Sequence, residues 1–113
     1  MTISGQNFEM HQGDNKQLII TIYDENDAIL NLTGYDIVWV VYHPTTKSVI
    51  LSKSSGSGIT VPTPSSGQVV IDLLPADTLS VVPNTYNHEC EITLSSVVST
   101  TTTGIIKILY SRA

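Results

Sequence analysis

The sequence predicts an all-β domain, an antiparallel β-sandwich of seven or eight short strands with one short helical turn near residues 75–80. Ile and Val are abundant and Ser and Thr approach a quarter of the 113 residues. Ala occurs only at positions 28, 76 and 113, so good helix formers are scarce. Apolar and polar residues alternate over short segments, and Gly, Pro, Asn and Ser turns separate these segments at a spacing of about ten residues.

The first half of the chain holds the opening strands. Apolar and polar residues alternate over 8–11 and 17–23, and the acidic turn at 24–27 ends the second of these segments. Residues 29–32 resume as a short extended piece. The segment 36–43 is apolar on both faces, so we expect it at the centre of a sheet.

The second half continues the pattern. Pro75 and Asp77 stand where the first turn of a helix favours a proline and an acid, which predicts one short helical turn. The stretch 54–58 reads as a flexible loop, and 95–103 forms either a hairpin loop or an extension of both flanking strands. A single domain covers residues 1–113, because so short a chain builds one core. Strands are expected over 48–53, 59–61, 68–73, 86–94 and 104–110.

Two of these strands supply the expected core. In the segment 36–43, alternate residues place Ile37, Trp39 and Val41 on one face. In the segment 86–94, apolar residues occupy one face and Asn and Glu residues the other. The candidate core residues are therefore Ile37, Trp39, Val41, Tyr86, Cys90 and Ile92.

Surplus apolar surface is the most informative functional signal. The segments 36–43 and 104–110 and part of 17–23 stay apolar on both sides, although one face of each strand in a sandwich should be polar. Only 13% of residues are charged, and charge on exposed edges keeps monomers from pairing. We therefore expect a neighbouring subunit to cover these faces, with loops of the same chain as the alternative. The candidate interface residues are Ile19, Tyr23, Val38, Val40, Tyr42, Ile105 and Leu109.

Charge and hydropathy exclude several classes of partner. The formal net charge is −5 and only five Lys and Arg residues occur, so the chain lacks the basic clusters that bind nucleic acid or anionic membrane surfaces. No apolar run approaches the roughly 20 residues of a membrane-spanning helix. The start MTISGQNFEM has neither the basic nor the apolar region of an export signal, so we expect synthesis in the cytoplasm.

No residue pattern predicts catalysis, a metal site or another cofactor. His11, His43 and His88 have uninformative spacing. His88 and Cys90 share a strand face and would allow the start of a zinc site, but a closed site needs two more ligands, so structural packing is the preferred interpretation. The acidic run at 24–27 lacks the spacing of a calcium loop and reads as a solvated turn. The chain contains no G-x-S-x-G elbow, P-loop or dinucleotide fingerprint.

Several motifs follow one another in an ordered set. Residues 8–43 contain Gly13-Asp14, an alternating strand, an acidic turn, Leu32-Thr33-Gly34 and an apolar strand. The second half adds SGSGITV, then GQVVIDLLPADTLSVVPNTYNHECEI with its Pro-Ala-Asp-Thr turn, and a Thr-rich turn before the last strand. This set resembles small Ig-like β-sandwich modules of tailed-bacteriophage virions, including the N-terminal domain of baseplate upper proteins.

The resemblance implies an Ig-like sandwich with a non-enzymatic docking role. In that family the module anchors fibres or decorates a virion, so we expect the virion as location and other virion proteins of the capsid, neck, tail or baseplate as partners. A homo-oligomer is expected in the assembly. Ala113 ends the chain just past the last strand, which favours a decoration, cement or neck-type subunit. Trp39 is reminiscent of antibody domains, although no cysteine pairs with Cys90 and the spacing of a tyrosine corner is absent.

Two other functions remain as alternatives. A carbohydrate-binding sandwich module for host-surface adhesion would present exposed aromatic rings as a stacking platform, but few rings occur and most occupy core-like positions. A small enzyme would need a concave pocket that contains two convergent titratable groups.

Overall fold

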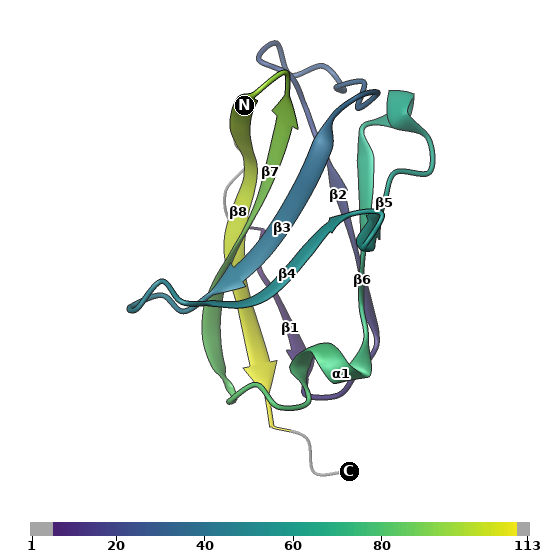
Figure 1. Ribbon diagram of the computed structural model, residues 1–113. Helices are drawn as coiled ribbons and strands as arrows, with labels where there is room; N and C mark the ends of the chain where they lie inside the picture. Colours follow the sequence, from purple (N-terminus) through teal and green to yellow (C-terminus); the bar gives the residue numbers. More distant parts are fainter. Residues whose placement is uncertain (1–5, 111–113) are drawn as a thin grey trace.

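The computed structural model describes residues 6–110, which form eight β-strands and two short helical turns (Figure 1). The turns are the 3-10 turn η1, Pro64–Ser66, and the α-helical turn α1, Pro75–Thr78, and neither is long and apolar enough to cross a membrane. The strands are β1 Phe8–His11, β2 Lys16–Thr21, β3 Asp36–Tyr42, β4 Val49–Ser55, β5 Gly58–Thr60, β6 Gln68–Leu73, β7 Asn84–Leu94 and β8 Val97–Leu109.

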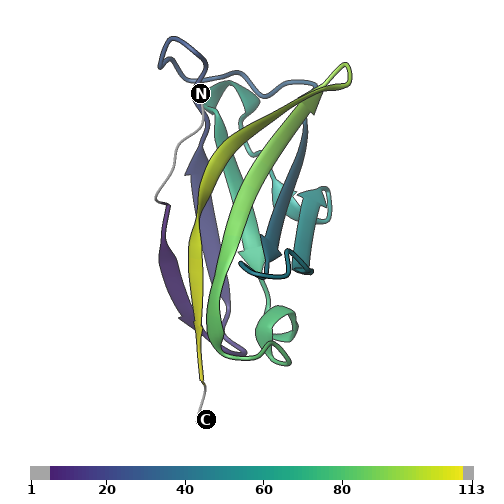
Figure 2. The same ribbon diagram turned by 90° about the vertical axis from the view of Figure 1, so that its left-hand side faces the viewer.

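One hydrogen-bonded ladder connects the eight strands in the order β1-β8-β7-β3-β4-β5-β6-β2. It folds over at the short β5, so that β1, β8, β7, β3 and β4 form a larger layer and β5, β6 and β2 a smaller one (Figures 1 and 2). The orders β8-β7-β3 and β5-β6-β2 are those of strands G-F-C and D-E-B in immunoglobulin domains. The long pairings are antiparallel except that of β1 with β8, which is parallel. The predicted Ig-like β-sandwich is confirmed.

In the Ser- and Thr-rich region, for which a hairpin loop and strand extension were both expected, β7 ends at Leu94 and β8 already begins at Val97. Ser95 and Ser96 adopt φ angles of 51° and 68° and close the hairpin with a two-residue turn. Two other segments differ from the predicted elements. β4 continues to Ser55, into the stretch expected to be a flexible loop. The expected extended piece at 29–32 contributes one isolated bridge, between Tyr23 and Ile29.

The core lies between the inward faces of the two layers. All six candidate core residues are buried, and Trp39, Val41 and Cys90 have no exposed surface. Side chains from the smaller layer join the same apolar cluster, which shows that alternate residues of each strand point inward. Those contributed by β2, its continuation and β6 are Ile20, Ile22, Val69, Ile71 and Leu73.

The Trp39 indole is hydrogen-bonded inside this core. Its Nε1–H donates to Nδ1 of His88 on the neighbouring β7, with 3.1 Å between the two atoms. Because an indole only donates, Nδ1 accepts and the imidazole proton resides on Nε2, which donates to the Gln6 carbonyl oxygen 2.6 Å away. Gly104 lies beside this contact, where a Cβ atom would collide with the Gln6 carbonyl. The hydrogen bonds therefore link β3, β7 and the segment that leads into β1.

A tyrosine corner forms at the start of β7. The Tyr86 hydroxyl donates to the carbonyl oxygen of Val82, four residues earlier, at 2.6 Å. The corner tyrosine of antibody domains stands two residues before the cysteine, whereas Tyr86 stands four residues before Cys90. The spacing thus differs, as the sequence indicates, but the interaction itself is present because the hydroxyl still reaches the chain that leads into the strand.

Asp77 anchors α1 at the lower end of the sandwich in Figure 1. Its carboxylate accepts the N–H of Leu74 at 2.7 Å and caps the predicted helical turn. The same carboxylate oxygen lies 2.7 Å from Nζ of Lys53 on β4, and the two side chains are only 17% and 11% exposed. This ion pair holds α1 against the edge of the larger layer.

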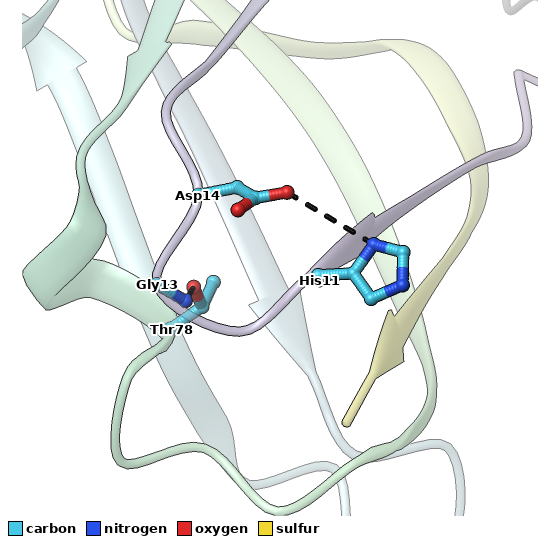
Figure 3. Close-up of polar contacts among 4 residues, drawn as sticks. All are labelled: His11, Gly13, Asp14 and Thr78. Carbon is cyan, nitrogen blue, oxygen red and sulfur yellow. Dashed lines mark hydrogen bonds and ion pairs between the residues drawn. The ribbon is translucent and has the colours of Figure 1, made fainter. Parts of the chain in front are cut away.

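The buried Thr78 connects α1 to the turn between β1 and β2. Its hydroxyl accepts the N–H of Gly13 at 3.0 Å (Figure 3). Gln12, the preceding residue, donates from Nε2 to the carbonyl oxygen of Val81 at 2.6 Å. Gly13-Asp14 and the Pro-Ala-Asp-Thr turn, two motifs far apart in the sequence, thus contact each other and close the same end of the sandwich.

Replacing Trp39 with Ala is expected to lower the free energy of unfolding by about 3–5 kcal/mol, because it leaves a large cavity and an unpartnered His88 nitrogen. Urea denaturation measures the difference. Trp39→Phe also loses the indole hydrogen bond but leaves a smaller cavity, so it should cost less. A loss below about 1 kcal/mol for Trp39→Ala would contradict its role in the core.

Asp77→Ala is expected to destabilise the fold by about 1–3 kcal/mol, because it removes the cap of α1 and leaves the Lys53 ammonium without its partner. Adding Lys53→Met should recover part of this loss, since no unpaired charge then remains in the poorly exposed site. Thermal unfolding of both variants gives the comparison. A double variant less stable than Asp77→Ala alone would argue against the ion pair.

Candidate functional site

A groove of about 590 Å³, called the hairpin groove below, lies between the β2–β3 connection and the β7–β8 hairpin. Both segments are at the upper end of the sandwich in Figure 1. The two segments are far apart in the sequence and meet because β3 and β7 are neighbours in the larger layer. The side chains that give the groove its chemistry are Tyr23, Asp24, Glu25, Tyr35, Leu94 and Val97.

Local hydrogen bonds set the shape of the β2–β3 connection. Oδ1 of Asp24 accepts the N–H groups of Asn26 and Ala28, at 2.8 and 3.0 Å, as in an Asx turn. Gly34 has a φ of +83°, which provides a tight bend at the Leu-Thr-Gly motif. A Cβ atom on Gly34 would lie 3.6 Å from Cδ1 of Leu94, so the connection packs directly against the hairpin.

The groove combines aromatic and aliphatic side chains with an acidic side. Tyr23 and Tyr35 supply the rings, Leu94 supplies aliphatic surface, and Asp24 and Glu25 supply the carboxylates. No Lys, Arg, His or Cys is among its described lining residues. This arrangement suits noncovalent binding of a partner with apolar and basic groups.

Apolar side chains are exposed at the tip of the β7–β8 hairpin, beside the groove. Val97 is 67% exposed, Val98 59% and Leu94 40%. Sequence reasoning placed none of the three among the candidate interface residues. The available signal was the Val-Val pair within a Ser- and Thr-rich run, because two consecutive apolar residues in a strand cannot both face the core.

The seven candidate interface residues do not form one surface. Five lie on the outer face of the larger layer, whereas Ile19 and Tyr23 belong to β2 and its continuation in the smaller layer. Ile19, Val38 and Ile105 are exposed, at 57%, 38% and 40%. The remaining four are half-buried within the chain itself, namely Tyr23, Val40, Tyr42 and Leu109.

Neighbouring side chains cover part of the outer face of β3. On β7, Glu91 stands opposite Val38, and Glu89 follows on the same face. The Lys47 ammonium lies 5.7 Å from the centroid of the Tyr42 ring. Charged groups thus flank the outer face of β3, where Val40 and Tyr42 are half-buried within the chain and Val38 remains exposed.

The three histidines lie in separate places. His11 is exposed on β1, with its Nδ1 4.0 Å from Oδ2 of Asp14 (Figure 3). His43 stabilises a turn after β3, where its Nδ1 accepts the N–H groups of Thr45 and Thr46 at 3.1 and 3.2 Å. Neither histidine lies near the groove.

His88 and Cys90 share the inward face of β7, and both are held in structural contacts. Burial lowers the pKa of His88, and the hydrogen bond to the Gln6 carbonyl opposes this shift. Burial raises the pKa of the Cys90 thiol to about 11, while a hydrogen bond with Thr101 acts in the opposite direction. Within residues 6–110, no group of three or more His, Cys, Asp or Glu side chains is placed to hold a metal ion.

A second hollow, of about 640 Å³, lies where β4 and β6 diverge beyond β5. Lys16, Lys53 and Asp72 line it. Lys53 is paired with Asp77, and Asp72 accepts a hydrogen bond from the Gln17 amide at 3.1 Å. The polar groups of this hollow are largely engaged within the chain, so the hairpin groove is the stronger candidate for a binding site.

No family model and no curated protein matches the chain. Among solved structures, that of murine CRIg is similar over 95% of this chain and 93% of its own, with 17% sequence identity and a TM-score of 0.39. The Ig-like assignment rests on the strand order and pairing of this chain itself.

The stability of the fold should depend on the protonation of His88. The unfolded chain binds this proton near pH 6.5, whereas the folded chain binds it only at lower pH because burial disfavours the cation. The contribution of the neutral His88 to the free energy of unfolding is therefore fully present above about pH 6.5. It decreases as the pH falls from there toward the pKa of His88 in the folded chain. His88→Gln keeps a donor and an acceptor but cannot titrate. Urea denaturation between about pH 5 and 7 should show that the free energy of unfolding depends less steeply on pH in this variant than in the unmodified protein. An equal dependence on pH would contradict the role of His88.

Proposed function

We propose that the protein is a non-enzymatic structural subunit of a tailed-bacteriophage virion, which docks onto another virion protein of the capsid, neck, tail or baseplate. The observation that carries the docking role is the apolar hairpin tip beside the groove, where Leu94, Val97 and Val98 are exposed. The ordered sequence motifs support the phage assignment, and the contact of Gly13 with Thr78 gives two of these motifs a common structural role.

Burial of the hairpin tip provides a driving force for association. Removing apolar surface from water contributes about 25 cal/mol per Å². A stable protein contact covers roughly 800 Å² on each partner, so the tip forms its centre and the groove and neighbouring loops surround it. The two-residue turn at Ser95 and Ser96 fixes the tip in advance, which reduces the entropy lost on binding.

The acidic side of the groove defines the chemistry of the partner. Asp24 and Glu25 line it, and the whole chain carries a formal net charge of −5. A complementary surface presents an apolar projection flanked by Lys or Arg. Attraction of this kind accelerates association at low ionic strength and weakens as salt screens the charges.

The double substitution Val97→Asp and Val98→Asp is expected to weaken docking by about 100-fold or more, because it places carboxylates at the centre of the contact. Titration calorimetry against the purified capsid, neck, tail and baseplate subunits encoded with this chain measures the affinity. Val82→Asp is the matched control, since Val82 is 71% exposed at the opposite end of the sandwich. Unchanged affinity of the double variant, or no binding of the unmodified protein to any of these subunits, would contradict the proposal.

A carbohydrate-binding role is the second candidate, because two tyrosines line the same groove. Tyr23 and Tyr35 offer aromatic faces, and Asp24, Glu25 and Asn26 offer hydrogen-bonding groups next to them. Rings combined with a few polar groups in a concave site are typical of small-ligand recognition. In this function the exposed hairpin tip would border a sugar instead of entering a protein contact.

A glycan array distinguishes the two candidates. The docking proposal predicts no binding to the array. If a glycan does bind, the second candidate predicts that Tyr23→Ala and Tyr35→Ala each lower its affinity by about two- to tenfold through loss of the ring. Tyr110→Ala is the control, because Tyr110 is 68% exposed and lies outside the groove.

A further inference from the structure

β2 ends the ladder on the side of the smaller layer, so one of its edges is unpaired within residues 6–110. It pairs in antiparallel register with β6, and the N–H of Ile22 continues this register by donating to the Gly67 carbonyl at 2.8 Å. Hydrogen-bonded residues alternate in such a pair, so the even-numbered residues of β2 bond to β6. The backbone N–H and C=O groups of Gln17, Ile19 and Thr21 therefore point to the open edge.

The open edge of β2 lacks the features that keep edge strands apart. The strand contains no proline and no bulge, and Lys16 at its start is its only charged residue. Ile19, in the middle of the strand, is 57% exposed. The edge strand of the larger layer, β1, is shorter and carries the exposed charged or polar side chains of Glu9 and His11. β2 is thus the edge better suited to the addition of another strand.

The space beside this edge is hollow. A cavity of about 340 Å³ lies along it, lined by Ile19, Thr21 and Tyr23, by Gln6 and by Thr102 of β8. Thr102 is only 1% exposed, and its hydroxyl has no hydrogen-bond partner in the described part of the chain. Residues 6–110 therefore leave this part of the β2 edge incompletely packed.

We propose that a second copy of this chain pairs with the open edge, β2 against β2, antiparallel about a two-fold axis centred on Ile19. In this register Ile19 faces the partner's Ile19, and Gln17 faces the partner's Thr21. The two central residues exchange their free backbone hydrogen bonds, and their exposed side chains pack together on the outer face. Lys16 falls opposite the partner's Ile22, so no like charges meet along the strand.

Self-complementarity is the reason to assign the edge to a second copy. A two-fold contact requires one patch to fit itself, and the run from Gln17 to Thr21 does so with polar residues at its ends and Ile19 at its centre. The pairing joins two three-stranded layers into one six-stranded sheet. Tyr23 lines both the cavity at this edge and the hairpin groove, but Leu94 and Val97 of the hairpin tip do not line the cavity, so separate variants test the two proposals.

Disulfide trapping tests this register. Ile19→Cys places two cysteines in a hydrogen-bonded pair with Cα atoms about 5.5 Å apart, which a disulfide can span. Mild oxidation of the full chain should give about tenfold more covalent dimer with this variant than with Thr21→Cys. In the proposed register, residue 21 faces residue 17 of the second copy, so the two cysteines of Thr21→Cys are too far apart to form a disulfide. A mixture of Gln17→Cys and Thr21→Cys should cross-link. The buried Cys90, with its pKa raised to about 11, stays unreactive.

Ile19→Pro adds a measurement in solution. The N–H of residue 19 is not used in pairing with β6, so proline removes a donor to the partner and spares the internal ladder. In analytical ultracentrifugation the unmodified protein and Ile19→Val should self-associate as concentration rises, and folded Ile19→Pro should remain monomeric. Three results would overturn the proposal: equal cross-linking of Ile19→Cys and Thr21→Cys, undiminished association of folded Ile19→Pro, or a dimer that forms only after residues 1–5 are removed.

Discussion

The hydrogen bond from the Trp39 indole to His88 joins the two central strands of the larger layer inside the core, and the arrangement around it follows from satisfying these buried polar groups. The imidazole must be neutral to accept from Trp39, and its second nitrogen then needs an acceptor, which the Gln6 carbonyl provides. That contact positions the chain that leads into β1 and its parallel pairing with β8. Trp39 also stands opposite the free Cys90, so packing and hydrogen bonds replace the disulfide of antibody domains at this place.

The two ends of the sandwich differ in how they are held. At the lower end, α1 is attached to β4 through Asp77 and to the β1–β2 turn through Thr78. At the upper end, the β2–β3 connection is held by its own turn and packs against a hairpin with exposed valines. A rigid scaffold that presents loops at one end is a common arrangement for recognition, because the loops can vary without disturbing the core. The β2 edge, unpaired within residues 6–110, runs along the side of the molecule and meets the groove at Tyr23.

The period-two pattern allowed most of the fold to be predicted. It separated the inward Ile37, Trp39 and Val41 from the outward residues of β3, and Pro75 and Asp77 marked the helical turn. The functional surfaces were harder to predict. Val97 and Val98 were hidden in a Ser- and Thr-rich stretch, because a two-residue turn with positive φ at two serines has no strong sequence signature. The surroundings of the outer face of β3 could not be predicted either, because Glu91 and Glu89 of β7, which stand opposite Val38 and Val40, are more than 40 residues away in the sequence.

The sequence by itself determined the all-β class, the approximate strands and the side chains that form the core, because these depend on local alternation and on the exclusion of apolar groups from water. It also determined the acidic, charge-poor character of the surface. Only the tertiary structure decided which strands are neighbours, which apolar faces the chain covers for itself, and which edge and hairpin remain open. These properties depend on contacts between segments far apart in the chain, and the register of those contacts is set by how the two layers fold over each other.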